Sequence, residues 1–132
     1  MIEYLFVYGT LMLGVEHPMA KWLSQHSEFV GAATFRGRLY RVSTYPGVVA
    51  SADPADRVTG DVLKLRNAAE VLPELDRYEA CGAEFAEPTE YLRKQGTVTL
   101  ASGEEIAVWI YLYNWPVDAK NRIASGTFTP TE

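Results

Sequence analysis

The stretch Tyr4-Leu5-Phe6-Val7-Tyr8-Gly9-Thr10-Leu11 is the part of the sequence from which the fold is best argued. Five apolar or aromatic residues lead into Gly9, which is typical of a buried strand that ends in a tight turn. Glycine at such a position permits unusual backbone angles and a close approach by another molecule. Amide groups beyond a strand have no ladder partner, so they suit a carboxylate or a developing oxyanion. The pattern alone leaves open a purely structural turn or an anion-binding one.

Two short helices are predicted outside this stretch. Pro18 suits a first helical position, and apolar residues at helical spacing follow it to about residue 26. Asn67 lies three residues before Glu70, the spacing of a capping box, and an apolar helix face then continues to about residue 78. Pro73 removes a backbone donor, so we expect a kink there or a helix whose regular turns begin there.

Strand patterns occupy much of the remaining sequence. Tyr45-Pro46-Gly47 is typical of a type II turn, Ser102-Gly103 of a second turn, and residues 80–90 of a loop. Strands are expected at 29–35 and 37–42 (two pieces broken or bulged at glycine), and at 48–50, 57–65, 91–93, 97–100 and 106–113. Many strands with two helices that do not alternate one for one favour the α+β class. We expect one domain over residues 1–132, a small closed or nearly closed sheet with short helices packed outside.

Composition narrows the function classes. The 132 residues include 12 basic and 17 acidic side chains, a net charge of −5, which argues against nucleic acid as a partner. A single cysteine excludes an internal disulfide and favours a cytoplasmic location. No apolar stretch approaches the length of a membrane span, so no membrane partner is expected. At this size a monomer or weak dimer is expected.

Few residues outside the opening stretch suggest chemistry. The sequence lacks phosphate-loop, dinucleotide and nucleophile-elbow motifs, and His17 and His26 have no ligand-spaced companions, so no metal or cofactor is expected. Cys81 is expected to be a small, partly buried thiol. Glu79 follows the apolar helix face, and a glutamate there is ordinarily a solvated helix end. Its charge faces the negative end of the helix dipole, however, and local conflicts of this kind are enriched at functional sites.

Tyr8-Gly9-Thr10-Leu11 and Leu75-Asp76-Arg77-Tyr78-Glu79 are two segments that match the motifs of a known family. They are similar to the Tyr-Gly-Ser/Thr signature and to the Leu-Asp-x-aromatic-Glu segment of the gamma-glutamylcyclotransferase-like superfamily, which this chain resembles. Tyr91-Leu92-Arg93, Trp109-Ile110-Tyr111-Leu112-Tyr113 and the tail from Trp115 to Phe128 also resemble family segments. The resemblance covers nearly the whole chain in the right order, and it points to the gamma-glutamylamine and small bacterial branches.

The resemblance implies a compact mixed β-barrel and a specific reaction. The α-nitrogen of a small-molecule gamma-glutamyl substrate attacks its own γ-carbonyl, which yields 5-oxoproline and a free amine or peptide. Glu79 then matches the family's catalytic acid/base. Tyr8, Gly9, Thr10 and Leu11 match its substrate-binding turn, and Tyr111 a tyrosine that helps to position the substrate. Arg93 is expected to form an ion pair at the surface of a strand.

Two departures from the family pattern leave other functions open. Ala80-Cys81 follows Glu79 where many members have glycine, and Met12-Leu13 replaces a basic residue often found after the turn. A small-ligand or protein-binding module without turnover is therefore the alternative. A barrel that binds oligonucleotides is disfavoured by the net charge. The leaving group is expected to face loops 12–17, 42–56 and 80–90.

Overall fold

The computed structural model describes residues 2–9, 18–43, 45–79 and 87–128. Six strands, two α-helices and one 3-10 turn lie within these ranges. In chain order they are β1 (Tyr4–Val7), α1 (Pro18–Gln25), β2 (Ser27–Arg41), β3 (Pro46–Ala50), β4 (Arg57–Leu65), α2 (Ala68–Tyr78), β5 (Tyr91–Leu100), β6 (Glu105–Tyr113) and η1 (Ala119–Asn121).

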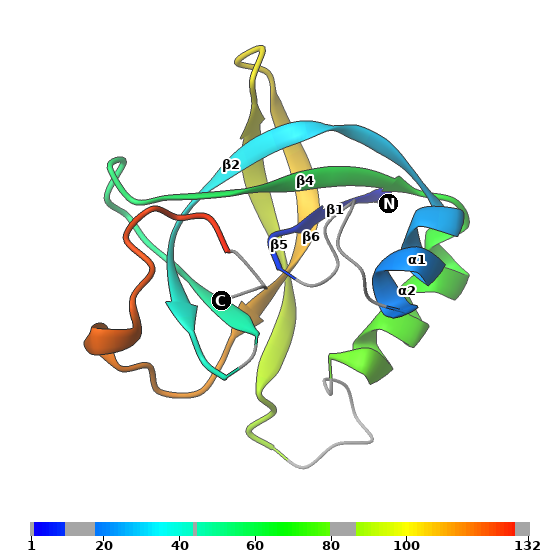
Figure 1. Ribbon diagram of the computed structural model, residues 1–132. Helices are drawn as coiled ribbons and strands as arrows, with labels where there is room; N and C mark the ends of the chain where they lie inside the picture. Colours follow the sequence, from blue (N-terminus) through cyan, green and yellow to red (C-terminus); the bar gives the residue numbers. More distant parts are fainter. Residues whose placement is uncertain (1, 10–17, 44, 80–86, 129–132) are drawn as a thin grey trace.

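The sheet closes into a barrel of five strands (Figure 1). Its strand order is β3-β2-β4-β1-β6-β5, and an additional pairing of β2 with β5 closes the ring and leaves β3 outside it. Strand β1 runs antiparallel to β4 and parallel to β6, so the barrel is mixed. Closure removes the exposed edges that an open sheet of this size would present. The predicted α+β fold, a mixed β-barrel with helices outside, is confirmed.

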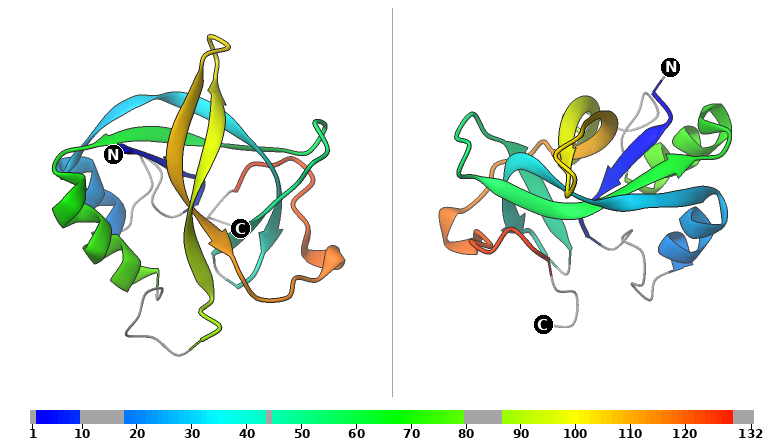
Figure 2. Two further views of the ribbon diagram at one scale, coloured as in Figure 1. Left: turned by 180° about the vertical axis from the view of Figure 1, so that it is seen from behind. Right: turned by 90° about the horizontal axis from the view of Figure 1, so that it is seen from above.

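The apolar run of β1 is buried on both faces because successive side chains of a strand point to opposite sides. Phe6 and Tyr8 belong to the cluster that fills the barrel, whereas Leu5 and Val7 belong to a second cluster between barrel and helices. Both helices lie side by side against one end of the barrel (Figure 2), and Leu23 and Leu75 are fully buried there. Each such burial stabilises the fold by about 1.5–3 kcal/mol.

Both predicted helices form, but one predicted cap does not. Asn67 precedes α2 in the left-handed conformation (φ 58°), and its side chain makes no capping hydrogen bond. The capping-box prediction was therefore wrong, because the backbone of Asn67 turns sharply out of β4 rather than approaching in an extended form. Pro73 lies inside α2, near the middle of the helix.

Strand β2 is continuous where two pieces were expected. It pairs with β4 from Ser27 to Arg36 and with β3 from Gly37 to Arg41, so the ladder partner changes without a break in the strand. The register shifts once, between Phe29 and Gly31. A bulge near glycine was therefore correctly expected, and a break before Gly37 was wrong.

The predicted type II turn at Tyr45-Pro46-Gly47 was also wrong. Pro46 and Gly47 are the first residues of β3, where proline is tolerated because it begins a strand. The chain turns earlier, and the Val42 amide donates to the Tyr45 carbonyl at 3.0 Å. A Cβ on Gly47 would lie 2.7 Å from the Tyr113 side chain, so glycine is required there for the close approach of β3 to β6.

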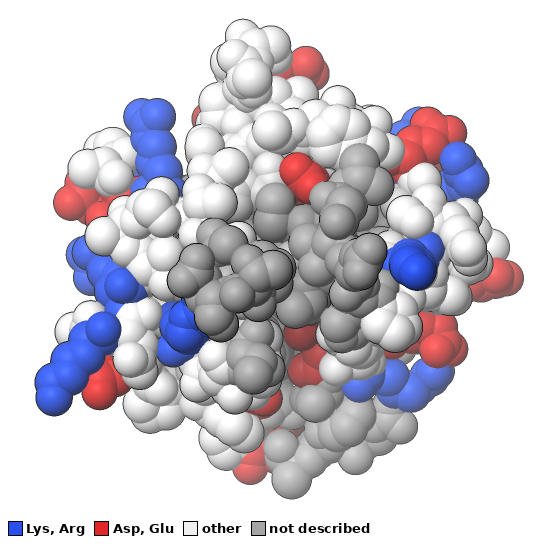
Figure 3. All heavy atoms as spheres, in the orientation of Figure 1, with Lys and Arg blue, Asp and Glu red and all other residues white. Residues whose placement is uncertain are grey.

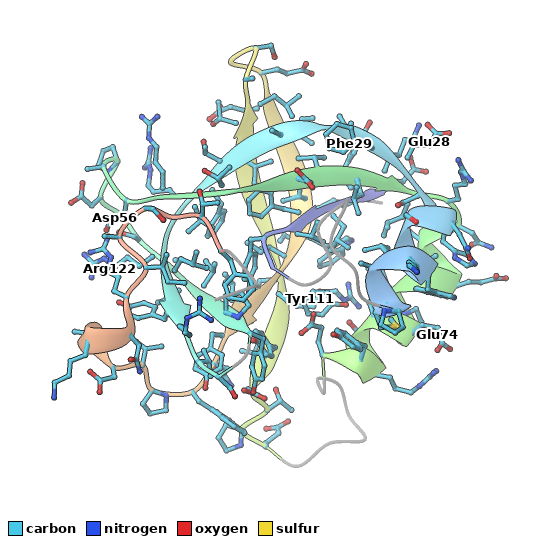
Figure 4. All side chains as sticks on the ribbon, viewed as in Figure 1. Glu28, Phe29, Asp56, Glu74, Tyr111 and Arg122 are labelled. Atoms are coloured by element: carbon cyan, nitrogen blue, oxygen red, sulfur yellow. The ribbon has the colours of Figure 1, made fainter. Side chains whose placement is uncertain are left out.

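A cluster of ion pairs on the side of the barrel opposite the helices holds the C-terminal segment against the barrel. Asp56 accepts hydrogen bonds from Arg38 of β2 at 2.7 Å, from Ser51 at 2.7 Å and from Arg122 at 2.8 Å. Figure 4 shows Asp56 and Arg122 together on the side of the molecule opposite the helices. The side chain of Asp56 is buried, and these bonds, with that from Arg38 the strongest, hold its pKa well below the usual range.

Candidate active site

The end of β1 lies against the start of β3. A Cβ on Gly9 would meet the Pro46 ring at 2.7 and 2.9 Å, so no larger residue fits without displacement. Gly9 is not among the described residues with positive φ, so close packing is what requires glycine here. Thr10 and Leu11, the other two predicted residues of this turn, lie outside the described residues.

Tyr8 is the last buried residue of this stretch, and its side chain is only 7% exposed. Its hydroxyl donates to the backbone carbonyl of Tyr111 on β6. Burial raises the pKa of Tyr8 well above its usual value, and the charge of Glu79 raises it further; a backbone hydrogen bond from Val48 partly offsets this. The hydroxyl at the β1 end and the carboxylate at the α2 end therefore lie within electrostatic reach of each other.

Glu79 caps the C-terminal end of α2. Its amide donates to the Leu75 carbonyl at 2.8 Å, which completes the last helical turn and leaves the side chain free to point away from the helix. Within the described part of the chain, no cation or hydrogen-bond donor contacts its carboxylate. Burial raises the pKa of the Glu79 carboxyl to about 7, with a smaller contribution from the charge of Glu90.

A network one turn earlier fastens this helix end to the barrel. Asp76 accepts from Arg93 of β5 at 2.8 and 3.1 Å and from the Tyr111 hydroxyl of β6 at 2.7 Å. The predicted ion pair of Arg93 is confirmed, and its guanidinium also lies 4.4 Å from the centre of the Trp109 ring. Tyr111 lies between the barrel and α2 (Figure 4), with its hydroxyl engaged by Asp76. Its predicted contact with substrate stays a prediction.

A second carboxylate, which the sequence did not single out, lies beside the first. Glu90 precedes β5 and accepts from the Tyr45 hydroxyl at 2.6 Å, while the Tyr91 hydroxyl donates to the Pro46 carbonyl at 2.6 Å. The pKa of Tyr45 rises to about 12, first because of its hydrogen bond to Glu90. Glu90 and Tyr45 come from loops without periodic pattern, and only folding brings them next to Glu79. The one available signal was the family's Tyr-x-Arg segment, which begins immediately after Glu90.

One family profile spans nearly the whole chain. Residues 5–130 match the family described as "Gamma-glutamyl cyclotransferase, AIG2-like". The chain belongs to this family.

One sequence relative carries a name that agrees with this assignment, and two solved structures at low identity share the fold. A Methanocaldococcus jannaschii protein with a provisional gamma-glutamylcyclotransferase name is 27% identical over 114 residues, 85% of each chain. A mouse AIG2-like protein superposes with a TM-score of 0.69 at 20% identity, over 97% of this chain and 88% of its own. YkqA from Bacillus subtilis superposes with a TM-score of 0.70 at 23% identity, and this chain spans 97% of itself but only 40% of that longer protein.

The residues that resemble cyclotransferase motifs only partly converge in space. Tyr8 and Gly9 at the β1 end lie in the same region as Glu79, whereas the Tyr111 hydroxyl faces Asp76. Cys81 and the loops 12–17 and 80–86 lie outside the described residues. Among the described residues no group of three His, Cys, Asp or Glu side chains could hold a metal ion, and no helix is long and apolar enough to cross a membrane.

Proposed function

We propose that this protein cyclises gamma-glutamyl amides to 5-oxoproline and releases the amine, with Glu79 as the general acid and base. The proposal rests chiefly on a half-buried carboxylate with a pKa near neutrality at the end of α2, within electrostatic reach of Tyr8 at the end of β1. A general base works best when its pKa lies near the working pH. Family membership supplies the reaction class, and the raised pKa fits the role that the resemblance gives to this position.

Glu79 supplies the proton transfers in this reaction. The substrate's α-ammonium, with a reference pKa of about 8, must lose a proton before its nitrogen can attack the γ-carbon. An ordinary glutamate with a pKa of about 4.3 would take that proton at a cost of about 5 kcal/mol. With the pKa of Glu79 at about 7, the same transfer costs only about 1–2 kcal/mol.

The remaining steps balance without a co-reactant. The α-nitrogen forms a bond to the γ-carbon, Glu79 passes its proton to the departing nitrogen as the bond from that carbon to the amine breaks, and Glu79 then takes the second proton that the new lactam nitrogen must lose. Ring closure holds nucleophile and carbonyl on one molecule, a geometry in which effective molarities reach the order of 10⁵ M. Backbone amides of the turn that starts at Tyr8 and Gly9 and continues into Thr10 and Leu11 are proposed to hold the developing oxyanion.

The test is a direct assay of 5-oxoproline. The purified chain is incubated with a panel of gamma-glutamyl amides and dipeptides, and 5-oxoproline and free amine are measured by mass spectrometry. Glu79→Gln is expected to lower kcat/KM by about 10²- to 10⁴-fold, the usual contribution of a positioned acid or base. Glu74→Gln is the matched control, because Glu74 lies on the exposed side of the same helix in a pair with Arg77.

Two outcomes would contradict the proposal. A folded Glu79→Gln variant that forms 5-oxoproline at the parental rate would remove Glu79 from the mechanism. No 5-oxoproline from any substrate, together with saturable binding of one of them in calorimetry, would favour the alternative of a binding module without turnover.

A further inference from the structure

Strand β6 bonds to both halves of the candidate site through one residue. The backbone carbonyl of Tyr111 accepts from the Tyr8 hydroxyl at the end of β1, and the Tyr111 hydroxyl donates to Asp76 of α2 at 2.7 Å. Tyr111 therefore connects the strand that leads into the predicted oxyanion turn with the helix that ends at Glu79. This connection consists of hydrogen bonds, so it fixes distances between the two halves.

The position of β6 against β1 is fixed at the beginning of β1 as well. Leu5 pairs with Trp109, and the Trp109 indole donates to the Ile2 carbonyl at 3.1 Å. Together with the bond from the Tyr8 hydroxyl to Tyr111, these contacts hold β1 to β6 on both sides of the middle of β1. A group that is attached firmly to β6 is therefore also positioned relative to the end of β1.

Asp76 is the residue through which α2 joins this part of the barrel. Arg93 of β5 donates to both of its carboxylate oxygens, and these two side chains are only 25% and 22% exposed. The Arg93 guanidinium also lies over the Trp109 ring of β6. A bidentate pair fixes direction as well as distance. The Glu74–Arg77 pair, by contrast, is half exposed and joins two residues of the helix to each other, so it cannot orient the helix against the barrel.

The last turn of α2 depends on contacts with the barrel. The helix has only 11 residues, and helices this short are marginal without tertiary packing. Asp76 lies in its last turn and Glu79 caps it, so both carboxylates face the negative end of the helix dipole and oppose the turn when they are ionised. Arg93 offsets the charge of Asp76. Glu79 follows Asp76 by three residues, on the same side of the helix, so holding Asp76 also places the origin of the Glu79 side chain.

We propose that Asp76 and Arg93 are positioning residues, which hold the last turn of α2 so that the Glu79 carboxylate reaches a substrate bound at the end of β1. This rests on the proposed function of Glu79. A displacement of about 1 Å at a reacting group can cost on the order of 10²-fold in rate. Loss of the Asp76–Arg93 pair should therefore slow the proton transfers, whereas binding of the substrate is retained.

Steady-state kinetics of two variants test the first part of this proposal. Asp76→Asn is expected to lower kcat by about 10- to 100-fold and to change KM by less than about 3-fold. Arg93→Lys keeps the positive charge but loses the bidentate geometry, and it should lower kcat by about 3- to 10-fold. Assays at pH 8 keep Glu79 largely ionised, so that a change in its titration enters only weakly.

Glu74→Gln is the matched control for Asp76→Asn, because it removes an equal charge from an ion pair of the same helix that does not reach the barrel. It should leave kcat and KM unchanged. A loss in Asp76→Asn that is confined to KM would overturn the proposal, because Asp76 would then contribute to substrate binding and not to the position of the base.

A double-mutant cycle distinguishes positioning from a general loss of structure. In the Glu79→Gln background the base is absent, so Asp76→Asn is expected to lower the residual kcat by less than about 2-fold further. Urea titrations establish that every variant is folded in the assay. An equal loss in both backgrounds would overturn the proposal, because Asp76 would then act independently of Glu79.

Amide hydrogen exchange followed by NMR tests the same pair without turnover. The Glu79 amide donates to the Leu75 carbonyl at 2.8 Å, so its exchange reports opening of the last turn. Asp76→Asn should accelerate this exchange by about 10-fold or more, whereas Glu74→Gln should not, with the amides of β4 as the reference. Acceleration in Asp76→Asn without turnover of any gamma-glutamyl amide by the parent would refute the cyclotransferase and keep the role of the pair. Unchanged exchange, together with parental turnover in Asp76→Asn, would refute that role and keep the cyclotransferase.

Discussion

Asp56 and Glu79 are two poorly solvated carboxylates on opposite sides of one barrel, and their surroundings differ completely. Asp56 has two arginines and a serine hydroxyl around it, and its pKa falls well below the usual range. Glu79 has no cation among the described residues, a second glutamate within reach, and a pKa of about 7. The same chemical group is thus permanently charged at one place and ready to exchange a proton at the other.

The difference shows what each carboxylate contributes. The cluster at Asp56 joins β2, the loop before β4 and the C-terminal segment, so its bonds serve the fold. Among the described residues the Glu79 side chain has no hydrogen-bond or ion-pair partner, and its burial opposes folding whenever the group is ionised. Basic side chains on the face in Figure 3 lie mainly toward its left and right margins.

The largest expected effect is a contrast between variants of the two carboxylates, in which one variant loses activity and the other loses stability. Glu79→Gln should lose about 10²- to 10⁴-fold in kcat/KM and keep its stability at pH 5. Asp56→Asn should show the largest loss of stability of any variant considered, because two arginines lose a charged partner, and the folded fraction should keep its kcat. Thermal melts and 5-oxoproline assays on both variants measure this. Asp53→Asn, in the same loop but exposed, is the control, and comparable melting of both aspartate variants would count against the structural role.

The raised pKa of Glu79 predicts a pH-dependent cost to stability. The carboxyl titrates at about 7 when folded and at about 4.5 when unfolded, so its contribution is fully present below pH 4.5 and is lost as the pH rises through 7. At pH 8 to 9, Glu79→Gln should therefore exceed the parent in unfolding free energy by about 1–3 kcal/mol. Urea titrations at pH 4.5 and pH 8.5 measure the change, and a constant difference between the proteins at both pH values would contradict it.

The low pKa of Asp56 predicts the opposite dependence. Its contribution is present above the unfolded value of 3.8 and is lost as the pH falls toward the lower folded value. The stability difference between the parent and Asp56→Asn should therefore be constant above about pH 5 and shrink below pH 4. Denaturant titrations from pH 7 to pH 2.5 measure it. A difference that persists unchanged at the lowest pH would show that packing, and not charge, dominates this cluster.

The smallest predicted effect concerns the influence of Glu90 on Glu79. Glu90 is the secondary cause of the raised pKa of Glu79, so Glu90→Gln should move the acidic limb of the kcat/KM profile downward from pH 7, by less than about one unit. The gamma-glutamyl amide of n-pentylamine is a suitable substrate because its leaving group carries no further charge. Glu87→Gln, which changes an exposed glutamate of the same segment, should leave the limb in place. An upward shift in Glu90→Gln would mean that the two carboxylates do not interact as described.

Much of the fold was predictable because strands and helices leave periodic patterns. The strand at 57–65 and the helix from Pro18 were predicted almost to the residue. The failures have physical causes that lie outside local sequence. Pro46 and Gly47 were assigned to a turn although they begin β3, where the close packing of Tyr113 requires glycine. The break expected within β2 is absent because the strand has a ladder partner on both sides of Gly37.

The candidate site was predictable only in part, and the reason is similar. Glu79 was identified through a local conflict with the helix dipole and through the resemblance, and its environment fits that prediction. Glu90 and Tyr45 are 45 residues apart and carry no pattern, so their hydrogen bond could not be read from the sequence. The hydrogen bond from the Tyr111 hydroxyl to Asp76 could not be foreseen from the sequence either, and the expected contact of Tyr111 with substrate stays a prediction.

The position of β1 between β4 and β6 has a consequence for folding during synthesis. The Tyr8 hydroxyl bonds to a carbonyl 103 residues further along the chain, and Leu5 pairs with Trp109. During synthesis β1 can pair with β4 as soon as residue 65 has been made, but its pairing with β6 must wait until residue 109 has emerged. A nascent chain stalled before β6 would therefore lack one of the two sheet neighbours of β1, on the side where Tyr8 bonds to Tyr111 and Asp76 of α2 is held by β6.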